Sequence, residues 1–233
     1  MSLAGSDRAG YVRDVFERIA PRYDLMNRLM TAGQDIHWRQ EAIRWLRLQP
    51  GDRVLDLGAG TGDLAREALR QQPACHPIAV DFTIGMMQVG QQRGDGLDWT
   101  AADALHLPFA DQSFDAIVSG YLLRNVTDLP RALAEMYRVL KPDGRWVALD
   151  TTRPQPNIFS PLIKLYLKYG IPWLGTLITG QRDAYTYLPA STQAFLTAEA
   201  LAEALALAGF DDISFVRRMF GTMAIHRAEK RLE

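Results

Sequence analysis

The residues best suited to chemistry are the glycines and acids of the run Val54-Leu55-Asp56-Leu57-Gly58-Ala59-Gly60-Thr61-Gly62-Asp63. An apolar stretch that ends in alternating glycines predicts a buried strand, a tight loop and a helix whose first N–H groups face a ligand. The dinucleotide fingerprint is Gly-x-Gly-x-x-Gly, whereas these glycines are each separated by one residue. The spacing therefore favours S-adenosylmethionine (SAM) over NAD.

Two further acids stand where neighbouring strands are expected to end. Asp81 closes an apolar run about 20 residues after Gly60, the position of a ribose-binding carboxylate. Asp103 follows the predicted strand 97–102 and is expected near the adenine amino group. An ordinary strand-to-helix turn is the alternative interpretation of the glycine run alone. The predicted cofactor contacts are Asp56, Gly58, Gly60, Thr61, Asp81, Asp103, Ala104 and Gly120.

Composition limits the class of protein. The chain has 233 residues, of which 48% are hydrophobic and 23% charged, a profile typical of one large globular domain. A formal net charge of −1 without a basic run disfavours nucleic-acid binding. The single Cys75 cannot form an internal disulfide, and the chain begins without an apolar signal core, so a cytoplasmic location is expected. The four histidines are scattered, and no metal site is expected.

The elements that must position these residues alternate between strand-like and helix-like runs, which indicates a parallel sheet covered by helices. Strands are predicted near 53–57, 77–81, 97–102, 114–120 and 144–150, with helices over 62–71, 84–92 and 128–140. A helix over 198–208 precedes two strand-like runs, 211–219 and 220–227, which predict a terminal hairpin. The expected fold is α/β, a single-domain Rossmann-like sheet of about seven strands with the last strand antiparallel.

Two segments lie outside this sheet. Residues 10–47 predict two N-terminal helices, followed by a cofactor-binding core over 48–152. Residues 153–196 form an apolar segment before the C-terminal helix and hairpin of 197–233. Lysines and prolines interrupt its most apolar part, 158–179, so it does not predict a membrane span. We interpret 153–196 as a lid over a hydrophobic substrate, the alternative being a helical excursion packed on the core.

Several motifs along nearly the whole chain carry a family resemblance. The most specific are Tyr23-Asp24-x-Met26-Asn27 and Leu123-Arg124-Asn125-Val126-Thr127-Asp128, and Ala224-Ile225-His226 lies near the other end. The chain resembles the C-methyltransferases of menaquinone and ubiquinone biosynthesis, the UbiE/MenG family. That family usually has histidine at the position of Asp35 and a cofactor-contacting serine at that of Gly120.

The resemblance implies SAM-dependent C-methylation of a prenylated quinol, demethylmenaquinol first and the benzoquinol of ubiquinone synthesis, 2-methoxy-6-polyprenyl-1,4-benzoquinol, as the alternative. It leaves open a homodimer and transient contact with the membrane surface, to which the protein would then be peripheral. An NAD oxidoreductase and a catalytically silent SAM-binding scaffold are the other classes. Stabilisation by SAM rather than NAD would exclude the first, and quinol turnover the second.

The predicted catalytic residues follow from position and motif. Arg124 and Asn125 come after the strand 114–120, at the edge where the methyl donor is expected, and a guanidinium there can stabilise a quinolate oxygen. Asp63, at a helix start, is the candidate base. The alternatives are a structural salt bridge of Arg124 with an acid such as Asp128, and helix capping by Asp63. The predicted substrate contacts are Tyr23, Asn27, Tyr166, Trp173 and Tyr185.

Overall fold

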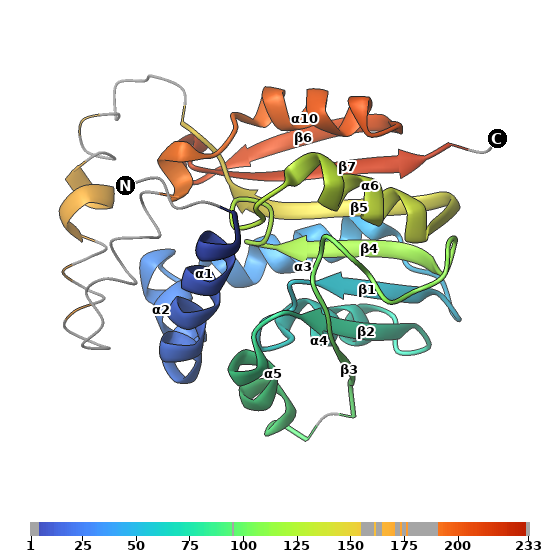
Figure 1. The fold of residues 1–233 in the computed structure, drawn as a ribbon, viewed down its shortest axis with the longest axis horizontal. Helices are drawn as coiled ribbons and strands as arrows, with labels where there is room; N and C mark the ends of the chain where they lie inside the picture. Colours follow the sequence, from blue (N-terminus) through green and yellow to red (C-terminus); the bar gives the residue numbers. More distant parts are fainter. Residues whose placement is uncertain are drawn as a thin grey trace.

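A mixed sheet forms the centre of the computed structural model (Figure 1). The structure describes residues 5–94, 96–154, 161, 165–170, 173, 176 and 191–231. Within these residues the sheet has seven strands in the order β3-β2-β1-β4-β5-β7-β6. The strands are β1 (Arg53–Leu57), β2 (His76–Asp81), β3 (Asp98–Ala101), β4 (Phe114–Gly120), β5 (Leu140–Thr151), β6 (Phe210–Arg218) and β7 (Met223–Lys230).

Strands β1 to β5 are parallel, and β7 is antiparallel to both of its neighbours, β5 and β6. The predicted α/β fold, terminal hairpin and antiparallel last strand are thus confirmed. The predicted start of β5 at residue 144 is wrong, because Leu140 already pairs with Phe114. The register then shifts, and Arg145 pairs with Ala116, so residues 141–144 form an irregularity in which Asp143 has a φ of 57°.

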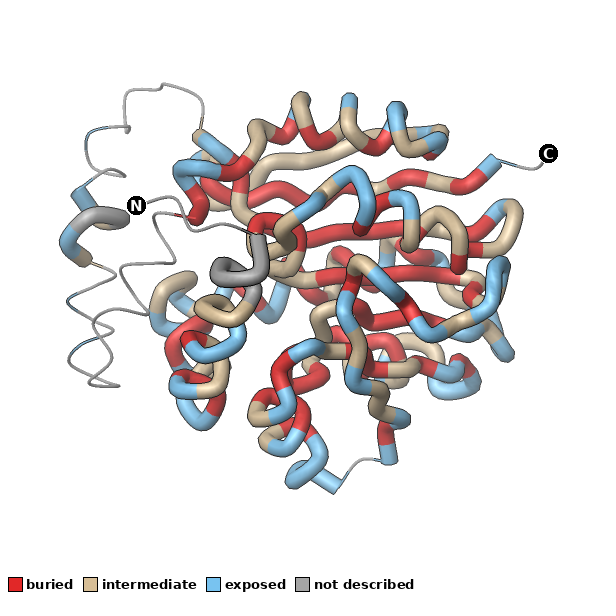
Figure 2. Tube along the Cα trace, in the orientation of Figure 1, coloured by how far each residue is buried: buried red, intermediate tan, exposed pale blue. Residues whose placement is uncertain are grey.

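Helices cover both faces of the sheet because alternate strand residues point to opposite sides. Val54, Val118 and Leu149 pack on one face with α3 (Gln34–Leu46) and α4 (Asp63–Gln71). Leu55 and Trp146 pack on the other face with α6 (Leu129–Val139) and α10 (Ala198–Leu207). Figure 2 shows that the buried residues concentrate in the strands between these layers. The predicted helices over 62–71, 84–92, 128–140 and 198–208 are confirmed within one residue at each end, the second being α5 (Ile84–Gln91).

The N-terminal region contains more helices than predicted. In place of two helices over 10–47, the structure has α1 (Gly5–Ile19), a 3-10 turn η1 (Ala20–Arg22), α2 (Tyr23–Met30) and α3. Pro21 lies inside η1 and cannot donate a helical hydrogen bond, which separates α1 from α2. Ala32 and Gly33 adopt left-handed conformations, with φ of 50° and 77°, and separate α2 from α3.

The parallel strands end at the side of the molecule where α1 and α2 lie (Figure 1). The apolar segment 153–196 begins and ends at one point, where Arg153 N donates to Leu196 O at 3.2 Å. Its described part includes the π-helical turn η2 (Tyr166–Gly170), and the Tyr166 hydroxyl donates to Met30 O at the end of α2, at 2.8 Å. Tyr185 lies outside the described residues.

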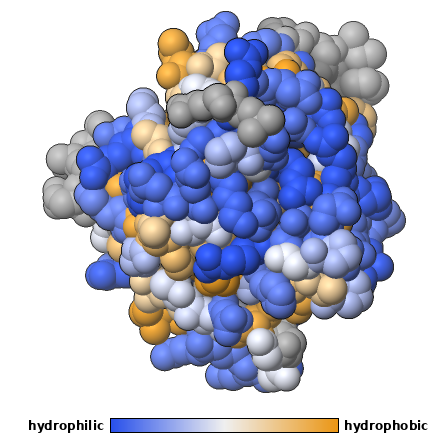
Figure 3. Space-filling view, turned by 90° about the vertical axis from the view of Figure 1, so that its right-hand side faces the viewer, coloured by the Kyte–Doolittle hydropathy of each residue, from blue (hydrophilic) through white to orange (hydrophobic). Residues whose placement is uncertain are grey.

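The opposite end of the molecule, where the parallel strands begin, has a predominantly hydrophilic surface (Figure 3). Ion pairs cross this end, among them Arg145 with Asp52 at 2.6 Å and Lys141 with Asp115 at 2.7 Å. Within the described part of the chain, no helix is long and apolar enough to cross a bilayer.

Candidate active site

An open cavity of about 830 Å³ lies at the carboxyl ends of β1, β2 and β4. The strand order reverses between β1 and β4, and open α/β sheets bind ligands at such a switch point. Eight sequence-predicted residues line it: Tyr23, Gly58, Gly60, Asp81, Asp103, Ala104, Gly120 and Asn125.

The glycine loop brings bare backbone to the cavity. Gly60 has a φ of 58°, and a Cβ built there would lie 3.1 Å from Met86 Cε on the opposite wall. The loop is fixed to β2, because the N–H groups of Gly58 and Ala59 both donate to Val80 O, at 2.8 and 2.9 Å. Because the loop is held in place, it could not move away to make room for a side chain at Gly60. Such a side chain would narrow the cavity between the glycine loop and Met86.

Two carboxylates on the cavity wall have acceptor capacity to offer a ligand. Asp81 accepts hydrogen bonds from Gly60 N and Thr83 N, each at 2.7 Å, and burial raises the pKa of its carboxyl. Asp103 accepts from Leu105 N at 2.9 Å. Each carboxylate oxygen has two lone pairs, so both side chains retain acceptor positions after these contacts. These free acceptor positions fit the hydroxyl and amino groups of a nucleoside cofactor, which donate hydrogen bonds.

Two predicted cofactor contacts, Asp56 and Thr61, do not line the cavity. Asp56 is fully buried and accepts from Ala65 N at 2.9 Å, at the start of α4, and burial raises its pKa to about 7. The Thr61 hydroxyl donates to the Asp24 carboxylate at 2.9 Å. These hydrogen bonds tie the glycine loop to α4 and to α2, on the side away from the cavity residues. The geometry of Asp56 and Thr61 therefore does not support the predicted direct contact with the cofactor.

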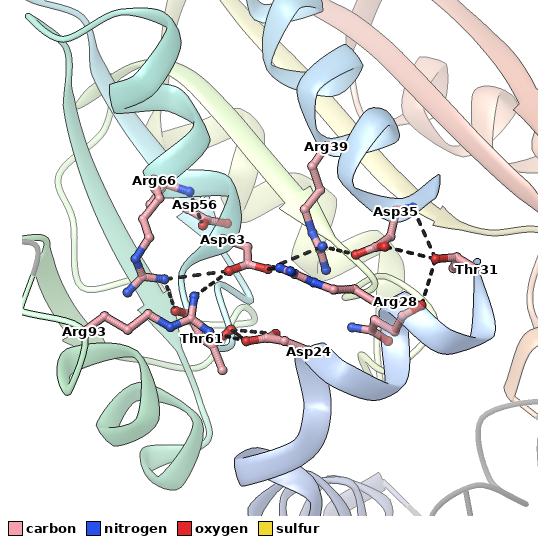
Figure 4. Close-up of polar contacts among 12 residues, drawn as sticks. Asp24, Arg28, Thr31, Asp35, Arg39, Asp56, Thr61, Asp63, Arg66 and Arg93 are labelled. Atoms are coloured by element: carbon pink, nitrogen blue, oxygen red, sulfur yellow. Dashed lines mark hydrogen bonds and ion pairs between the residues drawn. The ribbon is translucent and has the colours of Figure 1, made fainter. Parts of the chain in front are cut away.

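A chain of ion pairs joins the N-terminal helices to the glycine loop (Figure 4). Asp24 of α2 pairs with Arg93, which contacts Asp63 at 2.7 Å. Asp63 also lies 3.4 Å from Arg39 of α3, and Arg39 pairs with the fully buried Asp35. We call these five residues the ionic cluster.

The ionic cluster argues against Asp63 as the base. Burial opposes ionisation of this carboxyl, but Arg39 and Arg93 outweigh it and lower the pKa of Asp63. A carboxylate with a lowered pKa is a weaker proton acceptor. Asp63 also does not line the cavity and begins α4, which fits the alternative of a helix-terminal acid.

Arg124 is nearly buried and engages an acid that the sequence did not indicate. Its Nη1 lies 2.9 Å from Asp150 Oδ1, whereas Asp128 instead caps α6 by accepting from Arg131 N at 3.0 Å. Burial raises the pKa of Asp150, and Arg124 acts in the opposite direction. The alternative of a salt bridge for Arg124 is therefore confirmed, with Asp150 rather than Asp128 as the partner. Arg124 does not line the cavity, but the adjacent Asn125 does.

The predicted substrate contacts divide into two groups. The Tyr23 ring lines the cavity and meets Phe16 edge to face at 5.8 Å between ring centroids, while burial raises the pKa of its hydroxyl. Asn27, one helical turn later, is buried and does not line the cavity. Neither Tyr166 nor Trp173 lines it, and Trp173 is 67% exposed. The lid function of 153–196 thus stays a prediction.

Apolar residues complete the cavity and were not predicted as site residues. Phe82 and Met86 line one side, and Val12 and Phe16 of α1 line another. Phe82 is 40% exposed although it is a large apolar residue. Its position directly after the strand-end acid Asp81 is the sequence feature that could have identified it as a site residue. Val12 and Phe16 lie in the region 10–47, for which the sequence predicts helices, and neither is among the predicted ligand contacts.

Comparison with known proteins agrees with this architecture. A family model described as the ubiE/COQ5 methyltransferase family matches residues 3–230. The ubiquinone/menaquinone biosynthesis C-methyltransferase UbiE of Desulfotalea psychrophila is 46% identical over 217 residues, 92% of this chain and 88% of that protein. The demethylmenaquinone methyltransferase of Thermus thermophilus is 40% identical over 220 residues, 93% of this chain and 100% of that protein.

Solved structures share the fold. A SAM-dependent methyltransferase from Thermotoga maritima superposes with a TM-score of 0.64 at 20% identity, covering 94% of this chain and 99% of that chain. Phosphoethanolamine N-methyltransferase 2 of Haemonchus contortus, in complex with SAM, gives a TM-score of 0.66 at 16% identity, covering 93% of this chain and 60% of that chain.

Proposed function

The chain belongs to the ubiE/COQ5 methyltransferase family, and from this premise we propose that it methylates a ring carbon of a prenylated quinol, with demethylmenaquinol as the preferred substrate. The observation that carries the proposal is one cavity lined by two sets of polar residues. The glycine loop, Asp81 and Asp103 supply polar nucleoside contacts, and Tyr23 with Asn125 supplies polar groups on the substrate side.

We assign the nucleoside wall to SAM, which when bound supplies an electrophilic methyl group on a sulfonium. Asp81 would accept hydrogen bonds from the ribose hydroxyls, as strand-end acids do in related folds. Asp103 and Ala104 would border the adenine, with the apolar faces of Phe82 and Met86 beside it. Because Gly60 has no side chain, the backbone of the loop could approach the bound cofactor closely.

The substrate must become more nucleophilic before it reacts. A quinol ring carbon is a weak nucleophile until a neighbouring hydroxyl loses its proton, and the negative charge formed on that oxygen needs stabilisation. Arg124 would provide it, since Asp150 holds its guanidinium, whose carbon lies 5.3 Å from the ring centroid of the cavity residue Tyr121. The apolar side chains that line the cavity lower the local dielectric constant, which strengthens the attraction between opposite charges.

The alternative substrate is the benzoquinol of ubiquinone synthesis, which the name of the Desulfotalea relative covers. Contact with a membrane surface belongs to the proposal for either substrate, because a prenyl tail resides in lipid. Leu25 and Leu29 of α2 are 50% and 45% exposed, and Leu165 and Trp173 are 56% and 67% exposed. Apolar side chains with this exposure suit transient insertion between lipid headgroups.

Mass spectrometry with paired substrates tests the proposal. The purified protein receives SAM with demethylmenaquinol, or SAM with the benzoquinol, at matched prenyl length. We expect a mass gain of one methylene unit on the ring, faster with demethylmenaquinol. Faster turnover of the benzoquinol would reverse the substrate preference, and absence of product from either quinol would refute the function.

A further inference from the structure

Tyr121 is the first residue after β4 and is not among the site residues that the sequence predicts. Tyr121 lines the cavity next to Gly120, and its side chain packs against the core cluster on the α3 and α4 face of the sheet. The strand order reverses between β1 and β4 at this edge, where side chains of open α/β sheets face bound ligands. Tyr121 therefore lies where substrate and cofactor are expected to meet.

The backbone of Tyr121 adopts a conformation that bulky residues rarely take. Its φ is 61°, in the left-handed region, and of the described non-glycine residues with positive φ it alone lines the cavity. Neighbours hold it there, because Tyr121 N donates to Leu149 O and Asn125 Nδ2 donates to Tyr121 O, each at 2.8 Å. Strain held in place by its surroundings concentrates at ligand sites.

The Tyr121 hydroxyl is buried and makes no hydrogen bond within the described part of the chain. Buried hydroxyls of this kind are nearly always paired in folded proteins, so the missing partner calls for an explanation. The Arg124 guanidinium carbon lies 5.3 Å from the centroid of the Tyr121 ring. This phenol is thus next to the cation assigned to the quinolate oxygen.

The protonation state of Tyr121 decides what it can do. Burial raises the pKa of the phenol, while Arg39 and Arg124 act to lower it and Tyr23 and Asp35 act to raise it. The raised pKa keeps the proton on the hydroxyl at neutral pH. Tyr121 can therefore donate a hydrogen bond to an oxygen but is a poor base.

We propose that the Tyr121 hydroxyl donates a hydrogen bond to a ring oxygen of the quinol and so orients the ring toward the methyl donor. The inference rests on the proposed function. An oxygen that gains negative charge during the reaction accepts a stronger hydrogen bond, so this contact would both orient the ground state and stabilise the transition state. The competing acceptor is the carboxylate of the cofactor.

The test compares Tyr121→Phe with the matched control Tyr137→Phe. Tyr137 lies on α6, outside the cavity, and packs edge to face on Phe210 at 5.2 Å. Anaerobic calorimetry measures the affinity of each variant for short-tailed demethylmenaquinol, for the matching naphthalene without ring oxygens, and for SAM. Thermal unfolding is recorded alongside.

We expect Tyr121→Phe to weaken quinol binding by about 2- to 10-fold, the effect of losing one hydrogen bond between uncharged groups. Naphthalene and SAM affinities should stay the same, and the melting temperature should not fall, because the lost hydroxyl makes no hydrogen bond to any residue that the structure describes. Tyr137→Phe should leave quinol affinity unchanged.

Three results would overturn the inference: unchanged quinol affinity, equal weakening of quinol and naphthalene, or weakened SAM binding. Equal weakening would assign the ring to packing, and weaker SAM binding would assign the hydroxyl to the cofactor. A wild-type protein that binds the quinol through Tyr121 but transfers no methyl group would refute the proposed function and leave the hydrogen bond standing.

Discussion

Replacing Asp35 by alanine should destabilise the protein because it breaks a buried ion pair from one side. Asp35 is fully buried, pairs with the nearly buried Arg39 and accepts from the Thr31 hydroxyl at 3.0 Å. Loss of one partner of such a pair costs about 3 to 5 kcal/mol. Arg39 keeps Asp63 at 3.4 Å, so we expect the low end, about 3 kcal/mol. In a chain of this size that lowers the melting temperature by roughly 6 to 12 °C.

The double variant Asp35→Ala with Arg39→Met separates the ion pair from simple packing. It removes both charges, and Asp63 retains Arg93 at 2.7 Å, so at least half of the lost stability should return. Urea denaturation of the wild type, both single variants and the double variant gives the four free energies of unfolding. A double variant no more stable than Asp35→Ala would show that the aspartate contributes through local packing, and the reasoning would fail.

The remaining predictions concern the cofactor, the catalytic cation and pH. Asp81→Ala should weaken SAM binding by about 1 to 3 kcal/mol in calorimetry, the scale for a lost buried hydrogen bond, and unchanged affinity would remove Asp81 from the ribose site. Arg124→Met should lower both the stability and the kcat. The double variant Arg124→Met with Asp150→Leu should recover the stability, but its kcat should stay about 10²- to 10³-fold below that of the wild type. A double variant with the full kcat would show that Arg124 has only a structural role. Burial lowers the pKa of His226 from 6.5 to about 4, so the native state binds fewer protons than the unfolded state, and stability should fall as pH drops from 6.5 to about 4. In denaturation curves recorded at several pH values, His226→Gln should reduce the stability lost on acidification by on the order of 3 kcal/mol. The same pH dependence in the variant and the wild type would contradict the lowered pKa of His226.

Local sequence patterns predicted most of the sheet and the nucleoside wall. The run that ends at Asp56 and the one that ends at Asp81 are short apolar stretches closed by an acid, a pattern complete within ten residues. The pattern identifies strand ends, and parallel strands bring those ends together, so Gly60, Asp81 and Asp103 line one cavity. The same logic placed Asn125 there.

Features that depend on distant partners were not predictable. Asp63 has the spacing of a helix-start acid, but its charge is set by Arg39 and Arg93, which come from two other parts of the chain. Lys141-Pro142-Asp143-Gly144 has the composition of a strand boundary, yet the pairing of Leu140 with Phe114 begins the strand before it. Neither residue types nor spacing encode these contacts.

The hydrogen bond from Arg153 N to Leu196 O bears on how the segment 153–196 can change during evolution. It makes the intervening segment a loop that leaves and rejoins the cofactor-binding body at one point. The entropy of closing a loop grows only with the logarithm of its length, so doubling the segment costs roughly 0.6 kcal/mol. Evolution can therefore lengthen, shorten or replace it while β5 and β7 keep their pairing. The predicted role of this segment as a substrate lid would place selection on the substrate and selection on the fold in separate stretches of one chain.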